Sequence, residues 1–474
     1  MKRTAGVGVA IAAVAVAGWV GGTWYTGKRV EETVRKAASD ANTNALGIKV
    51  EWLSYERGVF SSTSRYRMTI PRPEQDPVMV VVDNKINHGP LPLDRLARAE
   101  LKPVSATSES FLVRDEGLGK ELKTVEPGAT IRANSVFDYN ENVTFDLTTP
   151  AMRYEQDGGT LEVGAGRVEG STVKATTHVK MNGTLASVRA TSPTPGPLTI
   201  DLRNLTMTVD SVAGRFGMQI GDSAFRVGGF SVSGPTPEDV PFSFTGDEFG
   251  VAWHVSEDDK FVNGHLSYSL GKLAINKTEI GDFDLRLVAR QLEGVATAKL
   301  VDAYRAEVSK ASAAPGPDAM QNALANLRTQ INAVLAGKPS LALDSLIWST
   351  PLGQSTLKID ANLLQRAGPA PQSGPDLGFE KATLDLSVSQ PALVDTIARF
   401  TKTGPGGKPI TLAQANEQAT MQLRMMLQGA TKSNLVVVNQ DKIESHVTFD
   451  GTSVLVNGKE PPPQLLLNLL QMIP

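Results

Sequence analysis

Most of the chain alternates apolar and polar residues with a period of two, which is the pattern of half-buried β-strands. The alternation is clearest in four stretches, 143–147, 283–289, 357–363 and 382–388. Because neighbouring residues of a strand point to opposite faces, each stretch would have one apolar and one wet face. The pattern starts at Ile48 and predicts a large, mostly antiparallel sheet.

Turn-forming residues separate the predicted strands. In 173–181 the odd-numbered residues are predicted to share one face of a strand, and Asn182-Gly183 is predicted to form the hairpin turn that follows. The apolar positions before and after Asn204 are out of step with each other, which predicts a bulge at that residue. These signals together favour a meander of hairpins.

A helical period replaces the alternation mainly in the second half of the chain. A helical insert is predicted at about 294–337, where the turn sequence 314–317 splits it into two helices. A further amphipathic helix is predicted at about 411–428, and a short one at 465–472 after three prolines. The fold class is therefore α+β, with 48–474 forming one β-rich domain.

The first residues have a different character, because no charged residue occurs between Thr4 and Tyr25. About 20 apolar residues in a helix cross the hydrocarbon core of a bilayer, so 1–27 is predicted to be an N-terminal transmembrane helix and 28–47 a helical stalk. Lys2-Arg3 before the segment favours a single-pass signal anchor that exports the rest of the chain. A cleaved signal peptide is the alternative, because Ala15-Val16-Ala17 has the form of a cleavage site.

Gly18 and Gly22 form one G-x-x-x-G pair within this predicted helix. Such a pair lets two membrane helices approach closely and is a candidate helix-dimer face. Ordinary composition is the alternative explanation, because glycine is common in membrane helices.

Composition narrows the chemistry further. The 47 Lys and Arg residues against 50 Asp and Glu residues give a net charge of −3, so we expect no nucleic-acid partner. The chain has no cysteine, which excludes disulfides, thiolate metal sites and Cys nucleophiles. None of the common catalytic motifs occurs, so we expect no enzymatic activity, no catalytic residues and no cofactor.

Two groups of polar residues are candidate sites. His254 and His265 are predicted to meet across a hairpin, but two histidines without further ligands do not make a metal site, and none is expected. The acidic run Glu257-Asp258-Asp259 offers a cation site or a pair of working carboxylates. A solvated hairpin turn is favoured, because Asp is a common turn residue.

Two short motifs carry a family resemblance. The residues Tyr55, Arg57, Gly58, Phe60, Ser61 and Ser62 match a Y-x-R-G-x-F-S-S signature, and the second motif consists of His88, Gly89 and Pro90. Both resemble signatures of the YdgA-like family of bacterial envelope proteins of unknown function. The resemblance implies a single-pass protein of the bacterial inner membrane with the bulk of its chain in the periplasm. It also allows a homodimer and implies no established catalytic residues.

The same motifs have a structural interpretation. Tyr55 to Ser61 predicts a strand-turn-strand corner, with Arg57 as a hydrogen-bond clamp on backbone carbonyls. His88-Gly89-Pro90 predicts the end of a strand, where glycine supplies unusual backbone angles and proline stops the ladder. A structural hydrogen bond is the favoured role of His88, and a functional role is the alternative.

Three hypotheses about function follow. The apolar face of so large a sheet must be covered by helices or by a ligand, so the first is a non-enzymatic role in envelope homeostasis with a lipid or another apolar ligand bound to the sheet. The second is a homodimeric scaffold or partner-binding protein. The third is a carboxylate-dependent hydrolase that uses Glu257 and Asp258.

Overall fold

The computed structural model describes residues 49–72, 75–121, 123–124, 126–156, 158–192, 197–236, 240–313, 326–366, 377–401 and 409–462. The predicted anchor, the stalk, the 465–472 helix and the Gly18-Gly22 face lie outside these ranges. Within them, no helix combines the length and the apolar character that a membrane crossing requires. The anchor and the helix dimer therefore stay predictions.

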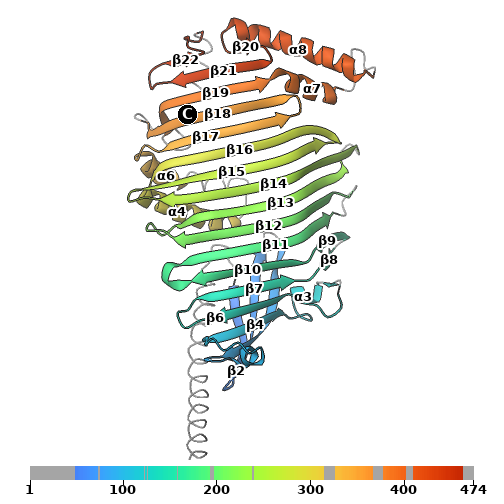
Figure 1. Ribbon diagram of the computed structural model, residues 1–474, viewed down its shortest axis with the longest axis vertical. Coiled ribbons are helices and arrows are strands. Elements are labelled where there is room, and N and C mark those ends of the chain that lie inside the picture. Colours follow the sequence, from blue (N-terminus) through green and yellow to red (C-terminus); the bar gives the residue numbers. More distant parts are fainter. Residues whose placement is uncertain are drawn as a thin grey trace, which may run out of the picture. The chain divides into compact units, whose positions relative to one another are not determined.

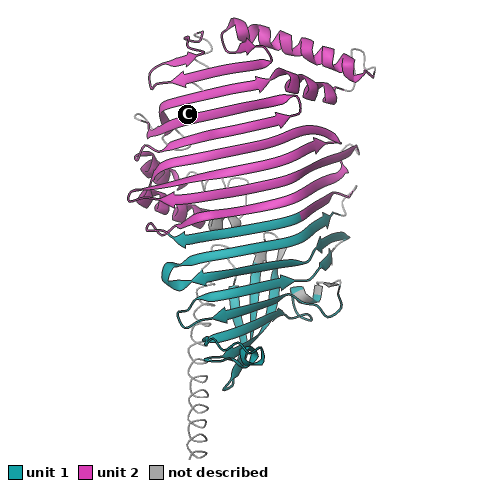
Figure 2. Cartoon of the chain, viewed as in Figure 1, with its two compact units in different colours: residues 1–193, 204–213, 308–316 teal, residues 194–203, 214–307, 317–474 magenta. Residues whose placement is uncertain are grey.

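The chain forms two compact units (Figure 2). Unit 1 consists of residues 1–193, 204–213 and 308–316, and unit 2 of residues 194–203, 214–307 and 317–474. Strand β12 (Thr199–Ala213) and helix α4 (Gly294–Ala313) each contribute residues to both units. The irregularity predicted at Asn204 is present within β12, where this residue has a φ of 53°.

Unit 1 is built on an antiparallel sheet with the strands β1 (Lys49–Arg57), β2 (Ser61–Arg72), β3 (Gln75–His88), β4 (Ala106–Leu112), β5 (Lys123–Thr124), β6 (Arg132–Phe137), β7 (Val143–Thr149), β8 (Met152–Gln156), β9 (Gly159–Val163), β10 (Gly166–Val173) and β11 (His178–Thr191). Strands pair in the order β1, β2, β3, β4, β6, β7, β10, β11. The end of β11 also pairs with β9, from which β8 and β5 continue. Two short helices, α2 (Leu93–Ala97) and α3 (Leu118–Glu121), lie between strands in the sequence.

The predicted turn at Asn182-Gly183 is wrong. The pairing of β10 with β11 aligns Asn182 with Glu169 and Gly183 with Val168, so both residues lie inside a strand. The chain turns earlier, at the 3-10 helix η1 (Lys174–Thr176). A ladder along the whole of β10 outweighs the local turn preference of one Asn-Gly pair, because each additional backbone pair adds hydrogen bonds.

Unit 2 contains a second antiparallel meander with the strands β13 (Gln219–Pro235), β14 (Pro241–Glu257), β15 (Phe261–Ile275), β16 (Thr278–Glu293), β17 (Ser340–Thr350), β18 (Gly353–Gln365), β19 (Leu377–Ser389), β20 (Val437–Asn439), β21 (Lys442–Phe449) and β22 (Val454–Val456). From β13 to β19 each strand pairs with the next in sequence (Figure 1). Strand β19 then pairs with β21, which also pairs with β20 and β22.

One face of this sheet is apolar across many strands. Residues paired across neighbouring strands share a face, and one such row runs from β14 to β19 through Trp253, Leu266, Leu287, Leu343, Ile359 and Leu384. The parallel row next to it on the same face contains Val255, Gly264, Ala289, Leu341, Ala361 and Ala382. The alternation predicted in 283–289, 357–363 and 382–388 is thereby confirmed, and β7 confirms that of 143–147.

The predicted helical insert is confirmed between β16 and β17, where the structure describes α4 and α6 (Arg328–Leu335). Leu335 of α6 is buried against Ala361 and Leu363 of β18, and Ile331 packs beside it. Helix α6 therefore covers the β18 end of the apolar face.

Two further helices follow β19, namely α7 (Gln390–Phe400) and α8 (Leu412–Lys432). The helix predicted at 411–428 is confirmed but runs to Lys432, and Thr411 caps it in a capping box with Gln414. The sequence prediction missed α7, although Ser389 before Gln390-Pro391 is a recognisable N-cap sequence. The two helices pack closely through small residues, among them Ala398, Ala415 and Ala419.

Candidate functional site

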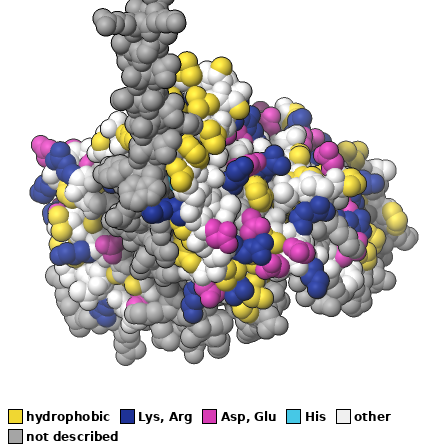
Figure 3. Space-filling view, turned by 90° about the horizontal axis from the view of Figure 1, so that it is seen from below, with side chains coloured by type: hydrophobic (Ala, Val, Ile, Leu, Met, Phe, Trp, Pro, Cys, Tyr) yellow, Lys and Arg dark blue, Asp and Glu magenta, His cyan; other side chains and the backbone are white. Residues whose placement is uncertain are grey.

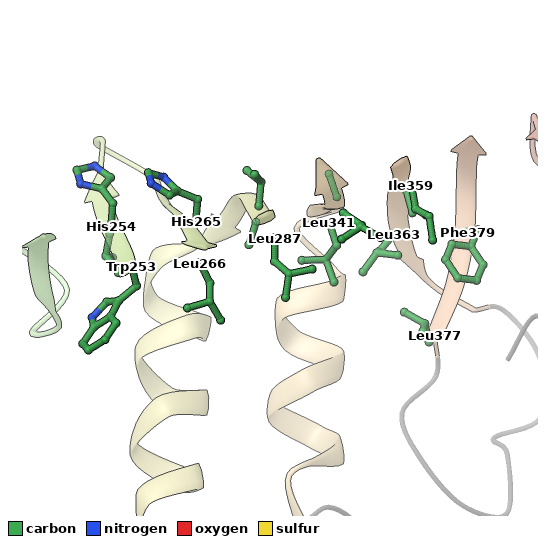
Figure 4. Close-up of a pocket in the computed structure, with 17 residues that line it drawn as sticks. Trp253, His254, His265, Leu266, Leu287, Leu341, Ile359, Leu363, Leu377 and Phe379 are labelled. Carbon is green, nitrogen blue, oxygen red and sulfur yellow. The ribbon is translucent and has the colours of Figure 1, made fainter. Parts of the chain in front are cut away.

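An apolar pocket of about 700 Å³ lies on the sheet of unit 2. Its lining residues come from β14 to β19, and Figure 4 shows their arrangement. Trp253, Leu266 and Leu287 point to the side on which the helices lie, whereas His254 and His265 point to the opposite side. The pocket therefore lies on the apolar face, and the two histidines border it through their backbone.

Part of this face is covered and part is open. Ala361 and Leu363, which lie under α6, are 6% and 5% exposed. Trp253, Leu287 and Leu341, on β14, β16 and β17, are 42%, 39% and 44% exposed. Large apolar side chains gathered on one exposed surface are typical of a ligand or interaction site.

The chemistry of the pocket is uniform. Among the described lining residues, the side chains on the apolar face carry no charge, and the indole N–H of Trp253 is their polar group. A site of this kind supplies contact to apolar groups and excludes water. It offers no acid, base or nucleophile to a substrate.

His254 and His265 do meet across the β14–β15 hairpin, as predicted. Their rings are stacked with centroids 5.4 Å apart, and Nδ1 of His254 lies 2.8 Å from a carboxylate oxygen of Asp222. Burial lowers the pKa of His265, and the charges of Arg286 and His254 lower it further. Within the described ranges, no group of three or more His, Asp or Glu residues has the arrangement of a metal site.

Asp258 and Asp259 form the exposed turn between β14 and β15, so the solvated-turn interpretation is confirmed for them, whereas Glu257 ends β14 and its side chain is only 10% exposed. One carboxylate oxygen of Asp258 accepts hydrogen bonds from the backbone N–H groups of Lys260 and Phe261, at 2.8 and 2.7 Å. These donors lower the pKa of Asp258 because they stabilise its charged form. Glu257 accepts the backbone N–H of Arg215 at 2.7 Å.

The two family motifs come together in unit 1. The first forms the predicted corner between β1 and β2, where the N–H of Gly58 donates to the carbonyl of Ser61 at 2.8 Å. The second ends β3, and the N–H of His88 donates to the carbonyl of Phe60 at 2.9 Å. Tyr55 packs against the buried core residue Ile86 beside this junction.

The side chain of His88 is held by the first motif. Its Nδ1 lies 3.2 Å from the carbonyl oxygen of Val59, which can only accept, so Nδ1 carries the proton. The other ring nitrogen, Nε2, then accepts from the hydroxyl of Ser62 at 2.9 Å. Burial lowers the pKa of His88 and keeps the ring neutral. These two hydrogen bonds support the structural role predicted for His88. The role of Arg57 stays a prediction.

Gly89 serves a different purpose from the one predicted. It is not among the residues with positive φ, so unusual backbone angles do not explain it. A Cβ at this position would lie 1.9 Å from the carbonyl oxygen of Val104. Glycine is required here because another backbone segment approaches it closely.

Positively and negatively charged side chains are interspersed on the face drawn in Figure 3. Among the ion pairs of unit 1, Nε of Arg65 lies 2.6 Å from Oδ1 of Asp83, and Arg98 lies 3.2 Å from Asp94. The Arg98–Asp94 pair is exposed, and exposed pairs contribute little to stability. Charge of one sign is therefore not concentrated among the described residues of that face.

The sequence prediction placed the pocket residues Leu287, Ala289, Ile359, Ala361 and Leu363 on the apolar faces of strands, but it did not predict that they line a pocket. For β17, the apolar residues Leu341 and Leu343 at alternate positions indicate a strand with one apolar face. The register that places Leu341 beside Ala289 is not readable from either segment alone.

Comparisons with known proteins identify two relatives that match almost the whole chain and one that matches a third of it. Protein YdgA of Escherichia coli (strain K12) is 23% identical over 97% of this chain and 94% of its own length. Uncharacterized protein YihF of the same strain is 21% identical over 97% of this chain and 96% of its own. An uncharacterized protein of Haemophilus influenzae is 27% identical over 33% of this chain and 43% of its own.

No solved structure matches the chain. The family described as "Bacterial protein of unknown function (DUF945)" matches residues 1–464. This confirms the resemblance that the two short motifs indicated. The chain therefore belongs to the DUF945 family of bacterial proteins of unknown function.

Proposed function

We propose that this chain is a non-enzymatic protein of the bacterial envelope, anchored in the inner membrane and facing the periplasm, that binds an apolar ligand in the pocket of unit 2. The observation that carries the proposal is the open part of the apolar face, where Trp253, Leu287 and Leu341 are each about two-fifths exposed. Side chains of this kind gain free energy when a ligand removes them from water.

The size and chemistry of the pocket support binding. A volume of about 700 Å³ lies within the range of roughly 300–1,000 Å³ that is typical of small-molecule sites. Burial of apolar surface contributes about 25 cal/mol per Å², so the lining can hold a ligand without ion pairs. The predicted membrane anchor would keep the pocket near a source of apolar molecules.

Site-specific photocrosslinking in cells tests the proposal on the full chain. A benzophenone amino acid replaces Leu287, which belongs to the apolar face, or its neighbour Arg286, which belongs to the opposite face. Irradiation is expected to add a small apolar molecule to the Leu287 variant, seen as a mass increase on the peptide that contains residue 287. The Arg286 variant is the matched control and should remain unmodified.

Two results would contradict the proposal. One is the absence of any small-molecule adduct at residue 287, and the other is an equal yield at residues 286 and 287. A crosslink from residue 287 to another protein chain would instead favour the partner-binding hypothesis.

A further inference from the structure

Helix α8 exposes three methionine side chains that lie close together in the sequence. Met421 and Met425 are each 62% exposed, and Met426 is 73% exposed. Among the methionines that the structure describes, the one other that is exposed is Met79 of β3, at 48%, whereas Met152 of β8 is 8% exposed. The most accessible thioethers of the described residues are therefore gathered on one helix.

The packing of α8 does not depend on these side chains. Its buried side consists of Ala415, Ala419 and Leu423, and Ala415 and Ala419 pack with residues of α7. Met421 and Met425 each lie two residues from Leu423, which is a rotation of about 200° around a helix with 3.6 residues per turn. They therefore lie on the side opposite to Leu423, and a chemical change of their sulfur atoms leaves the buried contacts intact.

Accessible thioethers react with oxidants to form sulfoxides, and methionine sulfoxide reductases reverse the reaction. With hypochlorous acid, the sulfur gains one oxygen atom and loses two electrons, which pass to the chlorine. An S–O bond forms, the O–Cl bond breaks, and chloride and a proton leave. The product side chain is polar, which is costly in a core and is tolerated where water already surrounds the side chain.

We propose that α8 is a reversible oxidant-consuming site, at which Met421, Met425 and Met426 take up most of the hypochlorous acid that the methionines of this chain reduce. The proposal is independent of the proposed function, because none of the three residues lines the apolar pocket. Each thioether removes one oxidant molecule, and the fold survives because the buried side of α8 is free of sulfur.

Peptide mapping by mass spectrometry on the full chain locates the oxidised residues. The protein receives one, two or three molar equivalents of hypochlorous acid before it is digested with trypsin, and cleavage after Arg424 separates Met421 from Met425 and Met426. More than half of all sulfoxide should be found in the two α8 peptides. Met152 should carry at least tenfold less sulfoxide than any of the three.

A pair of variants tests whether these thioethers protect the fold. The first replaces the three α8 methionines with leucine, which has a similar volume and a similar helix propensity. The matched control makes the same replacement at three partly buried methionines, namely Met68, Met181 and Met207. After two equivalents of oxidant, the thermal transition of the α8 variant should fall by several degrees from its own untreated value. The transitions of the original chain and of the control should stay within about a degree of theirs.

Reversal is tested on the oxidised, folded chain. The reductases MsrA and MsrB, which act on the two sulfoxide epimers, should together restore the mass of both α8 peptides. Dithiothreitol supplies two electrons and two protons for each sulfoxide, and the oxygen leaves as water.

Three results would overturn the proposal. They are sulfoxide spread evenly over the methionines, equal falls in the thermal transition of the two variants, and α8 sulfoxides that the reductases do not reduce in the folded chain. The peptide map uses the unaltered protein, so it decides the location even if the leucine variant folds poorly.

Discussion

The hydroxyl oxygen of Ser62 lies 2.9 Å from Nε2 of His88, and both residues are 1% exposed. These two side chains belong to different family motifs, which stand 26 residues apart in the chain. Since Nδ1 of the same imidazole also bonds to the carbonyl of Val59, one ring fastens the β1–β2 corner to the end of β3.

Replacing His88 with Ala should therefore destabilise unit 1. The change removes one buried and one part-buried hydrogen bond and leaves the hydroxyl of Ser62 unpaired. The unpaired hydroxyl costs about 1–3 kcal/mol, and the cavity left by the ring adds to this cost. A fall of several degrees in the thermal transition of the full chain is expected. His178→Ala is the control, because His178 pairs with an exposed Asp210, and its transition should move by less than a degree or two. Equal shifts would contradict the role assigned to His88.

The stability of unit 1 should also depend on pH through His88. Burial lowers its pKa in the folded protein below the ordinary value of 6.5, with a smaller contribution of the same sign from Arg57. Below pH 6.5 the unfolded chain then binds more protons than the folded one, so stability is full above this pH and falls as the pH drops below it. Thermal unfolding between pH 7.5 and 5.5 measures the effect. The pH dependence should be weaker in His88→Gln, and an unchanged dependence would exclude His88 as its source.

Gly89→Ala should be one of the most damaging single substitutions in the chain. The added Cβ would lie 1.9 Å from the carbonyl oxygen of Val104 and 2.8 Å from that of Ser105, so the backbone must move. We expect a loss of more than about 2 kcal/mol. In Gly429→Ala, by contrast, the new Cβ meets nothing within 4 Å on helix α8. That variant should be as stable as the original or more stable by about 0.5–1 kcal/mol, measured by the same unfolding transition.

Thr411 should contribute to the stability of helix α8 through its capping box with Gln414. Thr411→Ala removes the side-chain acceptor for the N–H of Gln414 and is expected to cost about 1 kcal/mol. Thr431→Ala, at the exposed opposite end of the helix, should change stability by less than about 0.5 kcal/mol. Denaturant titration followed by helical circular dichroism compares the two. A larger effect at residue 431 would contradict this account of the cap.

The covered and open parts of the apolar face should respond differently to truncation. Leu363 is 5% exposed beneath α6, so Leu363→Ala should cost about 2–5 kcal/mol. Leu287 is 39% exposed, so Leu287→Ala removes less buried surface and should cost under about 1.5 kcal/mol in the ligand-free protein. Thermal unfolding of both variants gives the comparison. A cost at residue 287 as large as that at residue 363 would mean that the pocket is filled by protein.

Local patterns predicted the elements that depend on local physics. Alternation located strands β7, β16, β18 and β19, because a half-buried strand must place its apolar residues at every second position. The helical period located α8, and a Thr at its start provided the cap. The turn predicted at Asn182-Gly183 is wrong because these residues pair with β10. A local turn sequence carries no information about a partner strand that is distant in the chain.

The sequence by itself determined that one face of the sheet is apolar, that no cysteine chemistry is available, and that the two motifs indicate a family. Only the tertiary structure decided which parts of that face are covered and that Ser62 reaches His88. The pocket arises because register aligns apolar residues of successive strands, such as Leu266, Leu287 and Leu343, on one face. Register is a property of paired strands, and a shift of one residue would turn every one of these side chains to the opposite face.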